Sequence, residues 1–313
     1  MMAMETLDRA QGVLYGQFIG DSLGSLVEFR APEEIAADYP QGVRELTSGG
    51  PFGLLAGQPT DDSEMALALA RSIISYGYFD QDDIRSAYER WMRSEPFTVG
   101  TTIRAALTGG FFNAESQANG ALMRISPLAV YGAGRPPEAE ESIAEAAIED
   151  ARMTHVNPLC TAINATYAVA LARIVRDGLS QPQAVEAVVS AARDYGNAEV
   201  QELVARSTEE PPAEYMLQMG WVKIAFGNAV YELATGASFE ESLVRTVGRG
   251  GDTDTNAAIC GALIGAMYGA EEIPQRWRET IDACKAYPGT PRPRPEEYWP
   301  ADAASLARGL LGR

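Results

Sequence analysis

Residues that many enzymes use for catalysis or metal binding are scarce in this sequence. Of its 313 residues only one is a histidine, His155, so a zinc site built from several histidines is excluded. No Gly-x-Ser-x-Gly motif accompanies this histidine, so nothing indicates a serine-hydrolase nucleophile. The three cysteines are widely spaced and form no Cys-x-x-Cys pair. They predict neither a disulfide scaffold nor a cysteine-ligated metal, and they favour a reducing, cytoplasmic location.

Positive charge is scarce as well. The sequence has 25 Lys and Arg against 43 Asp and Glu, a formal net charge of −18. Nucleic-acid binding needs a basic surface, so we expect no nucleic-acid partner. The N-terminal residues lack the apolar segment of a signal peptide, and the longest charge-free run of small and apolar residues, 256–270, is too short to cross a bilayer. We therefore expect a soluble protein with no membrane span.

Apolar residues recur at helical spacing along most of the chain, and no alternating strand pattern of comparable strength is present. The predicted fold class is all-α, with a single multi-helix domain over residues 1–286. A proline-rich C-terminal extension with a short last helix follows over residues 287–313. The predicted helices of the domain cover residues 10–24, 63–76, 80–93, 120–131, 138–153, 157–177, 180–194, 219–234, 238–247, 254–269 and 274–284.

Two of these helices carry small residues at every fourth position, namely Gly12, Gly16, Gly20, Gly24 and Ala257, Gly261, Gly265, Gly269. Residues four apart share one face of a helix, so each helix has a smooth stripe that permits close backbone approach. Glycine in a helix interior costs about 1 kcal/mol relative to alanine. The stripes therefore indicate tight helix packing that offsets this cost.

Carboxylates gather at two predicted helix starts. Thr60-Asp61-Asp62-Ser63-Glu64 follows a glycine-rich loop, residues 48–53, and Gly250-Gly251-Asp252-Thr253-Asp254-Thr255 precedes the second glycine-striped helix. Such residues are favoured helix caps, so capping alone can account for one cluster. Two clusters offer more carboxylates than capping needs. If the two helix starts face each other, their carboxylates require a cation or raised pKa values.

The chemistry of these side chains narrows the choice of cation. Oxygen ligands from aspartate and threonine suit Mg²⁺, Mn²⁺ or Ca²⁺ rather than zinc. Four carboxylates are more than one Mg²⁺ usually recruits, so the pattern favours a two-metal site.

The paired aspartate motifs resemble the ADP-ribosylglycohydrolase family, and most of all its bacterial dinitrogenase reductase-activating glycohydrolase branch. Further stretches agree in the family's order over residues 8–285. These stretches are Gly16-x-x-x-Gly20-Asp21-x-x-Gly24 followed by Glu28, Asn119-Gly120-Ala121-Leu122-Met123-Arg124, Thr154-His155-x-x-Pro158 and Gly220-Trp221-Val222.

The resemblance implies an orthogonal all-α fold around a central dimetal site with two Mg²⁺ or Mn²⁺ ions. The implied activity is hydrolysis of the glycosidic bond between ADP-ribose and a modified protein side chain, most often arginine, with ADP-ribose as product. Carried over by motif, the metal ligands are Thr60, Asp61, Asp62, Asp252, Asp254 and Thr255. The catalytic carboxylates are Glu28 and Asp62, and the substrate-binding residues are Asn119, Gly120, Met123, His155, Trp221, Gly250 and Gly251.

Several alternatives remain at this stage. The same chemistry can act on serine-linked or small-molecule ADP-ribose, such as O-acetyl-ADP-ribose. An immunity or inhibitory protein on this scaffold, blocking an ADP-ribosylating toxin, would be expected to have lost metal ligands, yet all six are present. Individual residues also have structural interpretations, which are a core position for Trp221, a local hydrogen bond for His155, a buried ion pair for Arg124 and a packing role for Asp21.

Overall fold

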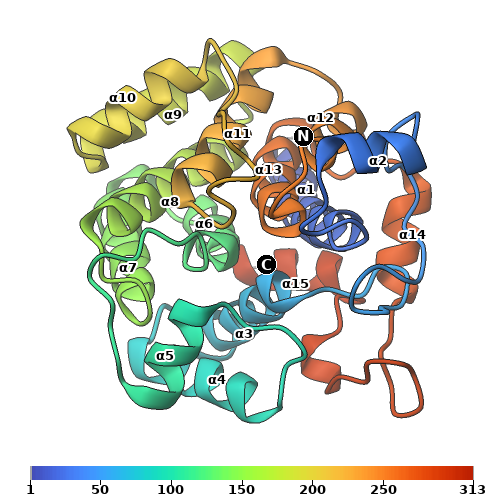
Figure 1. Cartoon of the computed structure of the whole chain (residues 1–313). Helices are drawn as coiled ribbons and strands as arrows, with labels where there is room; N and C mark the ends of the chain where they lie inside the picture. The colour runs from blue at the N-terminus through green and yellow to red at the C-terminus, as the bar shows by residue number, and fades with distance from the viewer. Residues whose placement is uncertain (1, 313) are drawn as a thin grey trace.

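The computed structural model describes residues 2–312, and within this range the chain forms fifteen α-helices, a few short 3₁₀ turns and no β-strand (Figure 1). The predicted all-α class is therefore confirmed. The helices are α1 (Met2–Gly24), α2 (Pro32–Asp38), α3 (Asp61–Tyr76), α4 (Gln81–Arg93), α5 (Thr101–Gly109), α6 (Ser126–Ala133), α7 (Glu140–Arg152), α8 (Pro158–Asp177), α9 (Gln181–Tyr195), α10 (Ala198–Ser207), α11 (Val222–Thr235), α12 (Phe239–Gly248), α13 (Thr253–Tyr268), α14 (Gln275–Ala283) and α15 (Ala303–Leu310).

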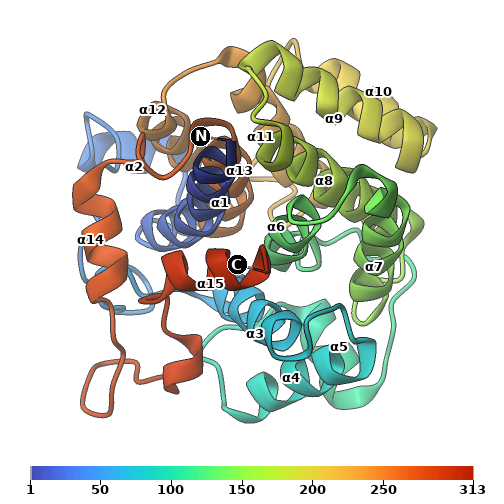
Figure 2. The same ribbon diagram turned by 180° about the vertical axis from the view of Figure 1, so that it is seen from behind.

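Helices α1 and α13 pack along their glycine stripes, and they lie side by side in both views of the molecule (Figures 1 and 2). The two helices run antiparallel, since the facing pairs are Gly12 with Gly265, Gly16 with Gly261, Gly20 with Ala257 and Gly24 with Thr253. This register places the C-terminal end of α1 beside the N-terminal end of α13. The glycines therefore bring the segment around Asp21 next to the second aspartate cluster.

The start of α3 is tied to the same place by a cap from another helix. Thr60 is the N-cap residue of α3, and its own backbone N–H donates to the Asp21 carboxylate at 3.1 Å. The N–H of Ser63, in the first turn of α3, donates to the same carboxylate at 3.0 Å. Donors at a helix start prefer an anionic acceptor. Asp21 thus joins the end of α1 to the start of α3.

Helix α8 forms a large part of the core, against α6, α7 and α9. By length and composition it is the one helix among residues 2–312 that is apolar enough to cross a membrane. However, 83% of that window is buried inside the fold, as expected for a core helix. Its Tyr167 hydroxyl donates to the carbonyl of Ile259 on α13 at 2.8 Å, which fixes α8 against the central pair.

Helices α2, α5 and α10 were not predicted from the sequence. Each has ten residues or fewer and buries only a few side chains, so the helical period is not evident from apolar spacing. The helix predicted over residues 120–131 was wrong at its start. Residues Leu122–Arg124 form a separate 3₁₀ turn, and α6 begins at Ser126 with Pro127 in its first turn.

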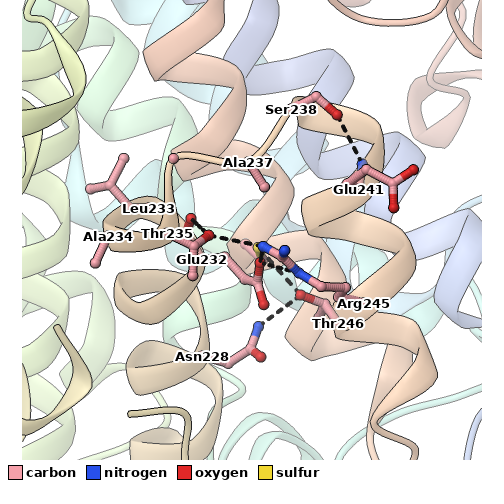
Figure 3. Close-up of polar contacts among 12 residues, drawn as sticks. Asn228, Glu232, Leu233, Ala234, Thr235, Ala237, Ser238, Glu241, Arg245 and Thr246 are labelled. Carbon is pink, nitrogen blue, oxygen red and sulfur yellow. Dashed lines mark hydrogen bonds and ion pairs between the residues drawn. The ribbon is translucent and has the colours of Figure 1, made fainter. Parts of the chain in front are cut away.

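A buried carboxylate holds α11 against α12. Glu232 is fully buried on α11 and forms ion pairs with Arg245 and Arg249 at the end of α12. Figure 3 shows Arg245 directed toward Glu232 between the two helices, with Asn228 bonded to the Thr246 hydroxyl at 3.0 Å. The loop that follows α12 contains Asp252, so this network holds in place the segment that leads into the second aspartate cluster.

The proline-rich tail returns onto the start of α3. Arg294 donates to both carboxylate oxygens of Glu64, at 2.7 and 2.8 Å, and to the Ser94 carbonyl. The Trp91 indole N–H donates to the same carboxylate at 2.7 Å. The side chains of Arg294 and Glu64 are only 4% and 1% exposed. The tail thereby neutralises a buried charge two residues from Asp62.

We expect Arg294→Gln to lower the free energy of unfolding by about 3–5 kcal/mol, because it leaves the Glu64 carboxylate buried without its partner. Chemical denaturation of both proteins at neutral pH measures this loss. Arg193→Gln is the control, since Arg193 and its partner Glu186 are 60% and 64% exposed. The control should change stability by less than about 1 kcal/mol. Equal losses in the two variants would contradict this role of the tail.

Candidate metal centre and active site

A cavity of about 400 Å³ opens where α1, α3 and α13 meet. Of the described residues that line it, none is lysine or arginine, and five are acidic, namely Glu28, Asp61, Asp62, Asp252 and Asp254. The two aspartate clusters predicted from the sequence therefore face one another across a single cavity. All five carboxylates are buried, so water screens their mutual repulsion weakly.

The carboxylates fall into two groups that share one member. Oxygens of Asp21, Asp62 and Asp254 lie within 4.8 Å of one another, and so do oxygens of Glu28, Asp252 and Asp254. Asp254 is the member common to both groups, and each group could hold a metal ion. Asp21 belongs to the first group, although the sequence suggested only a packing role for it. The glycines on either side of Asp21 were the signal that it approaches the centre closely.

The hydrogen bonding of these acids fits oxygen-ligated cations. Glu28 Oε2 and Asp62 Oδ1 are buried and accept no hydrogen bond within the described chain. By contrast, Asp61 accepts from the N–H of Gly100 at 3.2 Å, and Asp252 accepts from the Asn119 amide at 2.7 Å. Unpaired buried carboxylate oxygens are costly unless a cation or proton pairs with them. The donor set contains only oxygen, which suits Mg²⁺ or Mn²⁺.

The pKa values of Asp21, Glu28, Asp61, Asp62 and Asp254 are raised. Burial, followed by the nearby Asp252 charge, raises the pKa of Glu28 to about 8. Burial is also the main cause that raises the pKa of Asp61 to about 7 and of Asp21 to about 6. The pKa values of Asp62 and Asp254 are raised well above the usual range by burial and neighbouring carboxylates. Near neutral pH, protons and cations therefore compete for these carboxylates.

The raised carboxyl pKa values predict that the metal-free protein loses stability as the pH rises from about 4 to about 8. When the pKa of a carboxyl group is higher in the folded than in the unfolded state, the group's contribution to folding stability is fully present below the unfolded-state pKa. This contribution is lost as the pH rises through the folded-state pKa. The folded values of Asp21, Asp61 and Glu28 set the window. Thermal unfolding in EDTA should show a falling melting temperature, and saturating Mn²⁺ should suppress the fall. The same pH dependence with and without Mn²⁺ would contradict this assignment.

The other proposed metal ligands occupy supporting positions. Thr255 lines the cavity, and its backbone N–H donates to Asp254 Oδ1 at 2.9 Å. Thr60 does not line the cavity, but its hydroxyl lies 3.0 Å from Asp62 Oδ2 and fixes that carboxylate. Asn119, Gly120 and Met123, proposed from the sequence as substrate-binding residues, all line the cavity.

Three other proposed substrate contacts lie elsewhere. The Trp221 indole N–H donates to Gln117 at 2.8 Å, and the ring lines a separate hollow with Lys223 over its face. Gly250 and Gly251 are outside the cavity lining, and their N–H groups donate to the carbonyls of Val247 and Arg30. These donors are already used within the protein. The assignment of Gly250 and Gly251 to substrate binding stays a prediction, although these two N–H groups are not free to serve it.

Arg124 and His155 each had a structural interpretation and an interpretation as part of the substrate site, and the structure places the two residues differently. Arg124 forms a fully buried ion pair with Asp150 and does not line the cavity, so its role is structural. His155 lines the cavity, and its Nε2 atom has no hydrogen-bond partner within the described chain. It also has the local hydrogen bond that the alternative foresaw, between Nδ1 and the Thr154 hydroxyl.

Some residues of the cavity wall were not predicted from the sequence. Residues 98–103 line it and supply the Gly100 N–H that bonds Asp61. Phe29 and Met219 contribute apolar side chains that are 57% and 44% exposed. Phe29 has a φ of 65°, unusual for a residue with a bulky side chain, and its N–H donates to the Gly251 carbonyl. No motif distinguishes these residues from surface loops.

Known proteins are similar to this chain over most of its length. A family model described as ADP-ribosylglycohydrolase matches residues 2–304. The chain is 33% identical over 285 residues to the ADP-ribosyl-[dinitrogen reductase] glycohydrolase of Rhodospirillum rubrum, covering 88% of this chain and 90% of that protein. It is 26% identical over 294 residues to the ADP-ribosylarginine hydrolase Tri1 of Pseudomonas putida (strain GB-1), covering 88% and 75%. A solved structure described as an ADP-ribosylglycohydrolase-related protein complex has a TM-score of 0.76 at 28% identity, covering 99% of both chains.

Proposed function

Because the chain belongs to the ADP-ribosylglycohydrolase family and is a glycosidic hydrolase, we propose that it releases ADP-ribose from an arginine side chain of a modified protein, with two divalent cations. The observation that carries the proposal is the pair of carboxylate groups sharing Asp254 on the wall of the cavity. The donors are all oxygens, as Mg²⁺ and Mn²⁺ prefer.

The charge of the cavity supports arginine as the acceptor. Five acidic side chains and no basic side chain line it in the described chain. With Asp21 the site has six carboxylates, which outnumber the four positive charges of two divalent cations, so negative charge remains. This charge attracts a cationic guanidinium leaving group, whereas a serine hydroxyl or an acetyl ester gains nothing from it. The two relatives are named for an ADP-ribosyl-protein and for ADP-ribosylarginine, which supports the same choice.

The acidic centre is suited to catalysis once its charge is balanced. Bound Mg²⁺ or Mn²⁺ would supply positive charge that holds ribose hydroxyls and lowers the pKa of water. Asp62, Asp252 and Asp254, with Asp21 and Glu28, would hold the ions, and Asp61 on the same cavity wall remains a further proposed ligand. Thr60, Thr255 and Asn119 orient the carboxylates. The protein's charge of −18 repels a diphosphate at long range, so local donors and cations must provide the binding.

Glu28 and Asp62 are the candidates for proton transfer, since each offers an unpaired oxygen at the cavity. In the reaction, the C1″–N bond to arginine breaks and a C1″–O bond to water forms. One carboxylate accepts the proton of the water, and the released guanidine nitrogen takes up a proton. Asn119, Gly120, Met123 and His155 line the space available to ADP-ribose. The three cysteines are free and buried, in keeping with a cytoplasmic enzyme.

A panel of acceptors tests the proposal. ADP-ribose release should be measured from an arginine-ADP-ribosylated protein, a serine-ADP-ribosylated peptide and O-acetyl-ADP-ribose, each with Mg²⁺, with Mn²⁺ and with EDTA. We expect release from the arginine substrate at least about tenfold faster than from the others, and no release in EDTA. Faster release from the serine-linked peptide or from O-acetyl-ADP-ribose would show that arginine-linked ADP-ribose is not the preferred substrate. Metal binding without release from any substrate would favour an inhibitory protein on this scaffold.

A further inference from the structure

A series of buried hydrogen bonds, called the relay below, runs from α4 to the edge of the cavity. The Tyr88 hydroxyl donates to Asp150 Oδ1 at 2.6 Å, and Arg124 Nε donates to Asp150 Oδ2 at 2.9 Å. Arg124 Nη1 then donates to the Thr154 hydroxyl at 2.9 Å, and that hydroxyl lies 2.8 Å from His155 Nδ1. All five side chains are fully buried. The relay therefore ends on the only histidine in the sequence.

The donors and acceptors in this relay have a single fully satisfied order. A guanidinium can only donate, so the Thr154 oxygen is the acceptor toward Arg124. The one hydrogen of the Thr154 hydroxyl is then free to be donated, and His155 Nδ1 is the group in reach. If Nδ1 carried a hydrogen instead, it would point at the Thr154 oxygen and leave the hydroxyl hydrogen without an acceptor. Full satisfaction thus places the imidazole hydrogen on Nε2.

The Nε2 end of the ring is left for the cavity. His155 lines the cavity, and Nε2 has no hydrogen-bond partner within the described chain. Gly120 keeps this edge clear, since a Cβ added there would lie 3.1 Å from Cε1 and 3.3 Å from Nε2. A buried N–H without an acceptor is unfavourable, so a ligand oxygen at this point is favoured.

We propose that Thr154, held by Arg124, is a positioning residue that fixes His155 as the neutral Nε2–H tautomer and so presents one oriented donor to an oxygen of ADP-ribose. Only the identity of the ligand rests on the proposed function. The tautomer is a property of the free protein and is independent of any reaction. Burial and the Arg124 charge lower the pKa of His155 to about 3, in keeping with a ring that stays neutral.

Nitrogen NMR of histidine-labelled protein tests the tautomer, because one histidine gives one pair of imidazole signals. We expect Nε2 to show the shift of a protonated ring nitrogen and Nδ1 that of an unprotonated one, unchanged between pH 6 and pH 8. Thr154→Ser keeps the hydroxyl and should keep this pattern, whereas Thr154→Val should give a mixture of tautomers. An Nδ1–H ring or a mixture in the wild-type protein would overturn the proposal.

A matched control separates this role from packing. Thr166→Val makes the same change at a fully buried threonine on α8 whose hydroxyl has no partner, and it should leave the His155 signals and ADP-ribose binding unchanged. Thr154→Val should weaken ADP-ribose binding about tenfold, and Thr154→Ser should restore most of it. Gly120→Ala should weaken binding while leaving the tautomer intact, which keeps the test open if Thr154→Val does not fold. Equal binding by all four proteins would overturn the ligand contact.

Titration of the wild-type protein with ADP-ribose, ADP and ribose 5-phosphate locates the acceptor oxygen. A shift of the Nε2 signal with ADP as well as ADP-ribose assigns it to the diphosphate. A shift with ADP-ribose and ribose 5-phosphate alone assigns it to the terminal ribose phosphate moiety. No shift with any of them would refute the contact. Failure of ADP-ribose release in the acceptor panel leaves the tautomer result intact, so the two proposals fail separately.

Discussion

Asp254→Asn should lower kcat/KM for ADP-ribose release at least about 1,000-fold, because both carboxylate groups of the site lose their shared member. The same substitution should raise the melting temperature of the metal-free protein. Burial and the charges of Glu28, Asp62, Asp252 and Asp21 oppose ionisation of this carboxyl, so folding without metal requires either repulsion or uptake of a proton, and an amide requires neither. Activity assays and thermal unfolding in EDTA measure the two effects, which have opposite signs.

A surface aspartate provides the control for this prediction. Asp194 is half-exposed, pairs with Arg173 and is not among the residues that line the cavity. Asp194→Asn should leave activity and metal-free stability close to wild type. An Asp254→Asn protein that retains metal-dependent activity, or that is less stable than wild type in EDTA, would show that Asp254 has a structural role rather than the role of a shared ligand.

Gly16→Ala should lower the free energy of unfolding by about 3 kcal/mol or more. A Cβ at this position would lie less than 3.0 Å from the Gly261 carbonyl group, and backbone cannot move aside as a flexible side chain can. The added methyl must push α1 away from α13 along the whole stripe. Because this pairing brings Asp21 to Asp254, any folded Gly16→Ala protein should also bind Mn²⁺ more weakly.

Gly109→Ala is the matched control, since a Cβ there meets no atom within 4 Å and the residue lies at the exposed end of α5. Alanine is favoured over glycine in a helix, so this change should leave stability unchanged or raise it by about 0.5–1 kcal/mol. Denaturant unfolding of both variants makes the comparison. A Gly16→Ala protein as stable as the Gly109→Ala protein would contradict the close packing of the central helices.

The sequence predicted those features whose residue pattern along one helix also determines how that helix packs against others. The glycine stripes predicted tight packing, and they are the facing surfaces of α1 and α13. The two aspartate clusters were expected to meet only if their helix starts faced each other, and the register of the stripes produces that meeting. Capping chemistry and metal-ligand chemistry use the same residue types, so Thr60 serves as the N-cap of α3 while Asp61 and Asp62 face the cavity.

The features that were missed depend on which way a side chain or N–H group points. Asp21 was assigned to packing because a lone acid between glycines does not reveal that α3 and α13 begin beside it. Trp221, predicted as a substrate-binding residue, lies outside the cavity lining, and its indole N–H is bonded to Gln117. Gly250, predicted in the same way, uses its N–H to close the turn after α12. The spacing of a motif does not reveal which hydrogen bonds its residues form.

We propose that Asp254, which belongs to both carboxylate groups, joins two cation positions beside the cavity. Calorimetric titration of the metal-free protein with Mn²⁺, with electron paramagnetic resonance on the same samples, tests this proposal. We expect two ions per chain and the spectrum of a magnetically coupled pair, which Asp254→Asn abolishes. One ion per chain, or two ions whose spectra are independent of each other, would contradict it.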